Sequence, residues 1–494
     1  MNIRTFTDIK SFFLDNKTLK QTIFKNIFWL AVAEGISRLL EFVLIIYITR
    51  ILGATEFGKF TFALAFVSMF VILSDFGLSD IATRELSRDK ESEKEYLAIL
   101  SLKIFLSIGT LILMLIASFF ITPDPVIQKV IWILAIFILI SNFFLIIYAF
   151  LRARQRMEYE AGIKIFQALI IFSIVLFILF RFPSIENISR GYLIANLITS
   201  IVVLMFFHFY IYPLHFSFDR NIWQKFFRYS WPLGFAAIFS AIFGNIDSVM
   251  MGYWGQITET GWYNAAYKII NITILPAGWI AISFYPILSK FVKESKEKLQ
   301  RVWNYYMELM VILALPLVIG GIVLASKIVD FFYGQSYIPS ILAFQILIVM
   351  VGLHFLYYPP YLILVALNKQ KIFLKIISFG AILNIFLNFI LIPHFSLYGA
   401  AFTIVITYFS ILILLLIFTK NFLSISIFNT KLISGLIMSV LATGGMYFLI
   451  TQPFLYNLNI PLLTIIGISI YFGLFLLFFK INQIVMKKKE VSIQ

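Results

Sequence analysis

The charged residues best placed to do chemistry lie inside a long apolar run near the N-terminus. Glu34, Arg38 and Glu41 follow the spacing i, i+4, i+7, which places all three on one face of a helix. An ionised side chain near the centre of a bilayer costs roughly 2.5–3.5 kcal/mol on insertion scales, so this face needs partners or water. Two interpretations stay open: the three residues neutralise one another and hold the helix against its neighbours, or they line a wet cavity.

A second group of polar residues lies in the later half of the sequence. Asn245 and Asp247 occupy one apolar run and Lys268 occupies the next. Asp247 and Lys268 could pair across a helical hairpin or face the same cavity as the first group. Asp75 lies near the end of its own apolar run, where we expect water to reach it, so we give it little weight.

Several catalytic chemistries are excluded or disfavoured. The sequence contains no cysteine, which excludes disulfides, thiol nucleophiles and cysteine-ligated metals. Residues 53–60, GATEFGKF, nearly match a phosphate-binding loop, but Phe60 replaces the hydroxyl residue that holds magnesium. His354 lies beside Tyr357 and Tyr358, and we expect it to be packed rather than catalytic. We therefore expect no catalytic residue, no metal site and no cofactor.

The elements that must position these residues are membrane helices. The 494 residues are 61% hydrophobic and 13% charged, with a mean hydropathy of +0.96, whereas soluble domains are about 45–50% apolar and about 25% charged. Runs of roughly 18–25 apolar residues predict an all-α polytopic membrane protein with fourteen transmembrane helices. They fall near 26–49, 58–79, 97–121, 126–151, 161–180, 191–212, 230–253, 263–289, 303–326, 338–367, 372–392, 397–419, 432–451 and 460–479.

The basic residues test this count and predict an orientation. With the N-terminus in the cytoplasm, 31 of the 39 Lys and Arg fall on or just inside the cytoplasmic face, and 6 fall on the outer face. An excess of Lys and Arg marks cytoplasmic loops. A missed or invented helix would invert every later loop and remove the asymmetry. We therefore expect a multi-pass protein of the cell membrane, inner or plasma, with both termini in the cytoplasm. The formal charge of +15 is explained in this way without a nucleic-acid partner.

Two short matches indicate an internal repeat. TEFGKF at 55–60 matches TETGWY at 258–263, and RQR at 154–156 matches KQK at 369–371. Each pair is six predicted helices apart, so the two copies would have the same orientation. The sequence thus predicts two like-oriented six-helix bundles around a central cavity, followed by two further helices.

The predicted repeat divides the chain into segments. These are a cytoplasmic N-terminal segment (1–25), the first bundle (26–212), a cytoplasmic linker (213–229), the second bundle (230–419), helices 13 and 14 (432–479) and a basic cytoplasmic tail (480–494). No predicted connection is long enough to hold a soluble domain, since the longest hydrophilic stretch is 80–96.

Residues 48–88, which include LGATEFG at 52–58 and DFGL at 75–78, resemble the start of Wzx-type polysaccharide flippases. Residues 384–404 look like a later hairpin of the same group, which belongs to the multidrug/oligosaccharidyl-lipid/polysaccharide exporter superfamily. The resemblance implies a secondary transporter, and not an enzyme, that moves a polyprenyl-diphosphate-linked oligosaccharide from the cytoplasmic to the outer leaflet by alternating access.

The resemblance also implies roles for individual residues. Arg38 and Lys268, joined by Asn245, would bind the substrate, since a guanidinium grips a phosphate bidentately and an ammonium acts as a point charge. Glu34, Glu41 and Asp247 would bind a coupling proton or sodium ion. The expected partners are the lipid-linked glycan, the bilayer and other proteins of polysaccharide assembly. Alternatives are a proton- or sodium-coupled drug or organic-cation antiporter of the same superfamily, a lipid II flippase and, from another class, a glycan polymerase or acyltransferase.

Overall fold

The fold is helical throughout the part of the chain that the structure covers. A computed structural model describes residues 18–88, 93–423 and 430–491, and within these ranges there is no strand. Most of the N-terminal segment predicted for 1–25 lies outside the described residues. The chain divides into two compact units, residues 1–261 (unit 1) and 262–494 (unit 2). The predicted division at 213–229 stays a prediction.

Unit 1 is built from helices that bury a shared apolar core. Tyr96, Phe150 and Phe207 contact one another in this core. The helices are α2 (Leu19–Phe70), α3 (Ile72–Asp75), α4 (Leu78–Arg88), α5 (Glu93–Ile121), α6 (Pro125–Ala153), α7 (Met157–Arg181), α8 (Ile185–Phe206), the π-helix η1 (Phe207–Ile211), α9 (Arg220–Tyr253) and the first turn of α10 (Ile257–Glu294).

Unit 2 contains the remainder of α10 and the helices that follow it. These are α11 (Lys296–Tyr333), the 3-10 helix η2 (Gln335–Tyr337), α12 (Ser340–Ala366), α13 (Gln370–Leu423), α14 (Thr430–Ile450), α15 (Pro453–Tyr456) and α16 (Ile460–Val491). A smaller apolar cluster joins α11, α14 and α16 around Leu324, Met446 and Tyr471.

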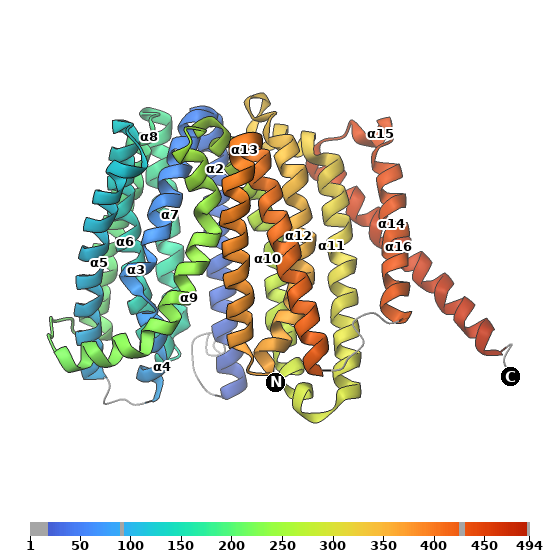
Figure 1. Cartoon of the computed structure of the whole chain (residues 1–494), viewed down its shortest axis with the longest axis horizontal. Helices are drawn as coiled ribbons and strands as arrows, with labels where there is room; N and C mark the ends of the chain where they lie inside the picture. Colours follow the sequence, from blue (N-terminus) through green and yellow to red (C-terminus); the bar gives the residue numbers. More distant parts are fainter. Residues whose placement is uncertain (1–17, 89–92, 424–429, 492–494) are drawn as a thin grey trace, which may run out of the picture. The chain divides into compact units, whose positions relative to one another are not determined.

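The described residues contain twelve helical segments long and apolar enough to cross a membrane, against the fourteen predicted. The difference lies in two very long segments, Gln21–Arg88 and Gln370–Phe422. Within them, α2 and α13 are each interrupted by a residue with non-helical backbone angles, Gly53 and Ser396, at the places where the sequence predicts a connection between two spans. A straight helix of 52 residues would be about 78 Å long, whereas the hydrocarbon core is about 30 Å thick. In Figure 1 the chain rises through α2 to the top of the view and comes back down to α3 and α4.

Two connections that belong to the predicted repeat have the same turn. Gln155 between α6 and α7 (φ 56°) and Asn368 between α12 and α13 (φ 58°) are both left-handed. In each case the next residue donates its N–H to a carbonyl five positions back, Arg156 to Leu151 at 2.9 Å and Lys369 to Leu364 at 2.8 Å. This is the hydrogen bond of a Schellman helix end. The turns are 213 residues apart, so the structural equivalence is shifted by two residues from the RQR and KQK match.

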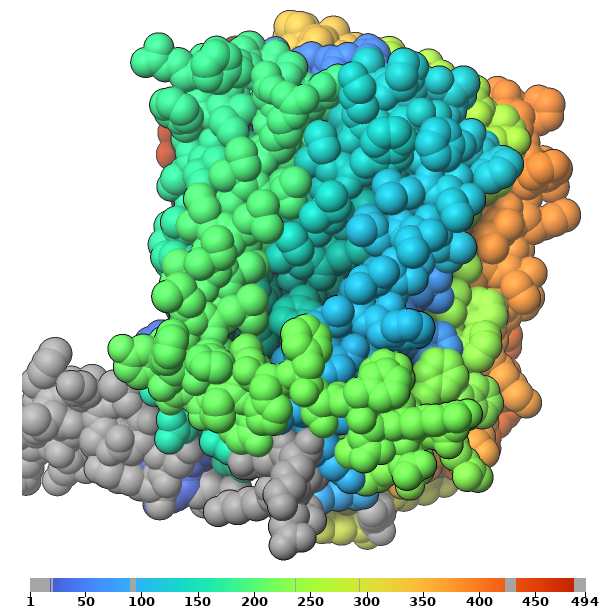
Figure 2. Space-filling model, turned by 90° about the vertical axis from the view of Figure 1, so that its left-hand side faces the viewer, coloured from blue at the N-terminus to red at the C-terminus, as the bar shows by residue number. Residues whose placement is uncertain are grey.

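The first turns of α9 cross the start of α5. Trp223 donates its indole N–H to the Ala98 carbonyl at 2.9 Å, and Lys225 pairs with Glu95 at 2.8 Å. Figure 2 shows this bright green segment lying over the lower part of the blue α5. Figure 1 shows α9 first running across the end of unit 1 and then turning along its helices. Pro232 lies inside α9, where the missing N–H permits such a bend.

Candidate functional site

The predicted ladder on the first membrane helix forms within α2. Arg38 Nε donates to Glu34 Oε1 at 2.8 Å, and Arg38 Nη1 lies 4.0 Å from Glu41 Oε2. The three side chains nevertheless keep 49%, 40% and 44% of their surface exposed, in the order Arg38, Glu34, Glu41. The ladder therefore neutralises the arginine, but it does not hold α2 by burying charge against a neighbour.

The other predicted site residues lie on α9 and α10. Asn245 donates its side-chain amide to the Ala241 carbonyl of its own helix at 2.9 Å. Asp247 is buried, with 5% of its surface exposed, and Lys268 is half-buried. Arg38, Asn245 and Asp247 belong to unit 1, where α2 packs against α9. Lys268 belongs to unit 2, and its pairing with Asp247 stays a prediction.

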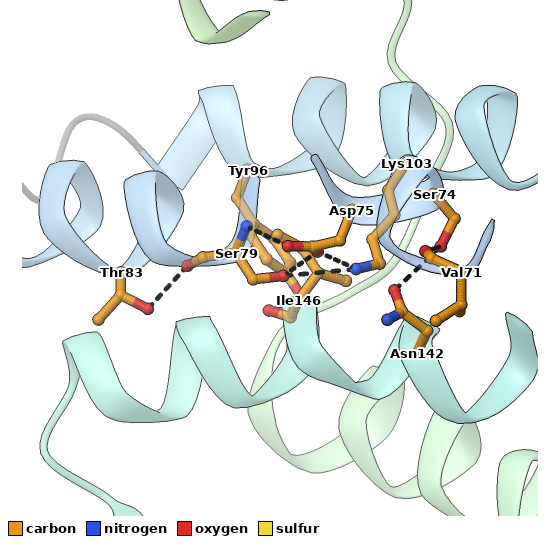
Figure 3. Close-up of polar contacts among 9 residues, drawn as sticks. All are labelled: Val71, Ser74, Asp75, Ser79, Thr83, Tyr96, Lys103, Asn142 and Ile146. Carbon is orange, nitrogen blue, oxygen red and sulfur yellow. Dashed lines mark hydrogen bonds and ion pairs between the residues drawn. The ribbon is translucent and has the colours of Figure 1, made fainter. Parts of the chain in front are cut away.

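A buried ion pair in unit 1 was missed by the sequence prediction. Asp75 was expected near water, but only 7% of its surface is exposed, so that expectation is wrong. Its Oδ1 pairs with the ammonium of Lys103 on α5, which is fully buried, and accepts a hydrogen bond from the Ser79 hydroxyl at 2.5 Å (Figure 3). Burying two charges is worthwhile only with close geometry and further hydrogen bonds, which this arrangement supplies.

The pair lies where the membrane helix is broken. Phe76 (φ 46°) and Gly77 (φ 80°) separate α3 from α4 with left-handed backbone angles. Asp75 is the last residue of α3, and its Oδ2 accepts the backbone N–H of Ser79 in the first turn of α4 at 3.4 Å. One carboxylate thus satisfies the start of a helix and holds a lysine from α5. The sequence signal was the DFG triplet together with a lysine inside a predicted span.

A second ionic cluster ties α6 to α7. Glu160 is fully buried and accepts from Arg152 at 2.6 and 2.7 Å, while Lys164 lies 2.9 Å away. On the same helix Glu158 pairs with Lys25 of α2 at 2.9 Å. These residues lie on the face predicted to be cytoplasmic, where their ion pairs join α7 to α6 and to α2.

The two matched segments of the repeat contact each other within unit 1. The hydroxyl oxygens of Thr55 and Thr258 are 2.9 Å apart. A Cβ added to Gly58 would collide with the Ile257 carbonyl, and one added to Gly261 would collide with the Ala54 carbonyl. At the repeat offset of 203, residue 54 is equivalent to 257 and residue 58 to 261. The contact is reciprocal, because residue 54 meets 261 and residue 58 meets 257. Only glycine permits so close an approach of two backbones.

A family model described as "Polysaccharide biosynthesis protein" matches residues 23–292, more than half of the chain. The chain belongs to this family. The resemblance to Wzx-type flippases of the wider exporter superfamily is thereby confirmed, and the protein is a multi-pass membrane protein of transporter type.

Relatives of this family member occur in bacteria and archaea. It is 25% identical to an uncharacterized membrane protein of Methanocaldococcus jannaschii, over 88% of this chain and 91% of the relative. It is 24% identical to the capsular polysaccharide biosynthesis protein CapF of Staphylococcus aureus, over 80% and 99%. It is also 24% identical to a putative O-antigen transporter of Escherichia coli, over 82% and 98%.

Solved structures share its fold. An inward closed structure of the lipid II flippase MurJ superposes with a TM-score of 0.74 at 16% identity, over 93% of this chain and 99% of the other. An inward-facing multidrug transporter of the MATE family superposes with a TM-score of 0.64 at 15% identity, over 81% and 98%. At such identities the similarity concerns the fold alone.

Unit 2 of this family member contains a large apolar pocket. Its volume is about 430 Å³, and it is bounded by α10, α11, α12, α14 and α16. Its lining includes Pro276, Pro316, Gly320, Met446 and Phe472. His354 lies outside this pocket and stacks on tyrosines, with its ring centre 5.5 Å from that of Tyr357, which confirms the expectation that it is packed.

Proposed function

We propose that this protein moves a polyprenyl-diphosphate-linked oligosaccharide from the cytoplasmic to the outer leaflet of the cell membrane. The observation that carries the proposal is Arg38, a guanidinium inside a membrane segment that keeps about half of its side-chain surface exposed. An exposed arginine can bind a diphosphate through two parallel hydrogen bonds. Family membership and the names of the relatives from Staphylococcus aureus and Escherichia coli support a glycan as the cargo.

The acidic residues have a complementary role in this proposal. Arg38 is held by Glu34 and Glu41, so a diphosphate that binds Arg38 competes with both carboxylates. The released carboxylates then bind a proton or a sodium ion, which couples substrate binding to ion binding. Asn245 on α9 also contributes to the substrate site, Lys268 on α10 is a second cation for the substrate, and Asp247 is the third ion-binding carboxylate. The lipid tail remains in apolar surroundings while the glycan crosses.

Substitution of the cations tests the substrate site. In cells that depend on this protein for surface glycan, Arg38→Ala and Lys268→Ala should each abolish the glycan while the protein still inserts into the membrane. Arg190→Ala is the matched control, because Arg190 also pairs with a glutamate four residues earlier and is similarly exposed. Wild-type glycan levels in both variants would remove Arg38 and Lys268 from the site.

We also propose that transport proceeds by alternating access, with the contact between residues 54–58 and 257–261 open in one state and closed in the other. Its reciprocal geometry supports this step. Since the natural sequence has no cysteine, the double variant Thr55→Cys/Thr258→Cys would carry the sole thiols. Oxidation should stop transport, and reduction should restore it, while Thr55→Cys alone should be insensitive to the oxidant. Full transport by the cross-linked protein would contradict the proposal.

The rival transport functions receive less support. The fold neighbours include a lipid II flippase and a drug transporter, but at 15–16% identity the likeness supports the architecture alone. The sequence relatives are named for capsule and O-antigen, and two archaeal relatives from Haloferax volcanii are named as probable flippases. Failure to restore surface glycan, combined with rescue of cells depleted of their lipid II flippase, would favour the lipid II alternative.

A further inference from the structure

Unit 2 contains a second, smaller pocket with a different lining. It lies between the end of α11, the turn through η2, the start of α12 and the last residue of α15, and its volume is about 390 Å³. The polar side chains that line it are those of Ser326, Lys327, Asp330, Gln335 and Tyr456. The charge pattern of the sequence predicts that Lys327, and with it the pocket, lies on the outer side of the membrane.

The walls of this pocket are held in place by contacts of their own. Lys327 Nζ donates to the Tyr456 carbonyl and, at 3.2 Å, to the Leu458 carbonyl, and it lies 4.5 Å from the centre of the Tyr456 ring. Gln335 Nε2 donates to Asp330 Oδ1 at 2.7 Å. Gly334, at φ 80°, makes the turn that brings Gln335 back over α11. A pre-arranged pocket loses less conformational entropy when a ligand binds.

The chemistry of the lining selects among ligand classes. An anion is disfavoured, because Lys327 is already held by two carbonyls and the Asp330 carboxylate is negative. A cation meets the ammonium of Lys327, and a hydrocarbon chain would meet five polar side chains beside the apolar Val329, Ile338 and Ile341. A neutral polyhydroxyl compound fits: Asp330 accepts from hydroxyls, and the Ser326 and Tyr456 hydroxyls both donate and accept. Ile338, with 54% of its surface exposed, offers an apolar edge for the C–H face of a sugar ring.

We propose that this pocket is a sugar-binding site that receives one monosaccharide unit of a glycan on the outer side of the membrane. A volume of about 390 Å³ lies within the usual range of about 300–1,000 Å³ for small-ligand sites. The assignment of the sugar to the transported glycan rests on the proposed function. Binding there would retain the glycan after it has crossed, and so oppose its return.

Sugar binding to the purified full chain tests the proposal. Glucose, galactose and N-acetylglucosamine are presented separately at millimolar concentrations, and saturation transfer from protein to sugar is measured by NMR. At least one sugar should give a signal that Asp330→Ala weakens about tenfold or more, as expected for loss of a hydrogen bond to a charged group. Asn457→Ala is the matched control, because Asn457 is exposed beside Tyr456 and does not line the pocket.

Other results would overturn the proposal. These are the absence of a signal from all three sugars, equal signals from the wild type and Asp330→Ala, and displacement of the sugar by inorganic phosphate, which would indicate an anion site. The test does not depend on transport. If Arg38→Ala abolishes surface glycan and no sugar binds, the pocket proposal alone fails. If a sugar binds as expected and Arg38→Ala keeps wild-type glycan, the substrate-site proposal fails instead.

Discussion

The buried pair of Asp75 and Lys103 should dominate the stability of unit 1. Lys103→Met leaves the Asp75 carboxylate without its cation at a site where the lysine is fully buried and the aspartate side chain is 10% exposed. Removal of one partner from a buried ion pair costs about 3–5 kcal/mol. For a unit of 261 residues, 1 kcal/mol corresponds to roughly 2 °C in Tm. We therefore expect Tm to fall by roughly 6–10 °C.

Removal of both charges should restore most of this loss. In Asp75→Asn/Lys103→Met neither partner is left with an uncompensated charge, and the amide still accepts from the Ser79 hydroxyl. Lys225→Met is the matched control, because Lys225 also forms an ion pair that involves α5, with Glu95, but the two side chains are 40% and 25% exposed. Exposed pairs contribute about 0–1 kcal/mol, so the control should lower Tm by less than roughly 2 °C.

The assay is thermal unfolding of the purified proteins in one detergent, followed by the loss of the monodisperse fraction in size-exclusion chromatography. The wild type, Lys103→Met, the double variant and Lys225→Met are compared at one concentration. The reasoning is refuted if Lys103→Met unfolds at the wild-type temperature. It is also refuted if the double variant unfolds as early as Lys103→Met, since the cost would then arise from packing and not from an unpaired charge.

Three further outcomes follow from the geometry. In the Thr55→Cys/Thr258→Cys protein, Gly58→Ala and Gly261→Ala should each reduce disulfide formation several-fold. Gly109→Ala, where an added Cβ meets nothing within 4 Å, should leave the yield unchanged. Equal yields in all three would disprove the tight crossing. Gly321→Ala should lower the free energy of unfolding by about 1–3 kcal/mol, because its Cβ would lie 2.6 Å from the Ile348 side chain. Gly320→Ala is the control: its Cβ would meet only the flexible side chain of Met446, at 3.8 Å. It should be near neutral in the same unfolding assay. Outward movement of a diphosphate of charge about −2 gains roughly 4–5 kcal/mol at 100 mV inside negative, so collapse of the membrane potential should slow flipping into vesicles, and an unchanged rate would rule out this driving force.

The helical architecture was accessible from the sequence because its signals are local. Apolar runs long enough to cross a bilayer predict helices directly. The i, i+4, i+7 spacing predicted the contact of Arg38 with Glu34 and Glu41, since those residues share one helix face. The difference between twelve and fourteen segments arises at Gly53 and Ser396, where the sequence predicts a connection between two spans but a single non-helical residue interrupts a continuous helical segment.

The contacts that the sequence did not predict join distant positions. Asp75 and Lys103 lie 28 residues apart on different helices, and hydropathy reports only that each is near the end of an apolar run. Which side chains meet is decided by the broken helix at Phe76 and Gly77, a tertiary feature. The repeat matched Thr55 with Thr258 as equivalents, but equivalence does not imply contact, and their 2.9 Å separation required coordinates.

The reciprocal crossing of Gly58 and Gly261 has a consequence for the origin of the chain. Residue 54 meets 261 as residue 257 meets 58, which is the pattern of an isologous interface between two identical subunits. A half-length ancestor would have made this contact with a second copy of itself, so each substitution there would have acted twice. In the predicted duplication, fusion into one polypeptide would have ended that constraint, and Lys59 and Trp262 differ across the junction while the glycines still face each other.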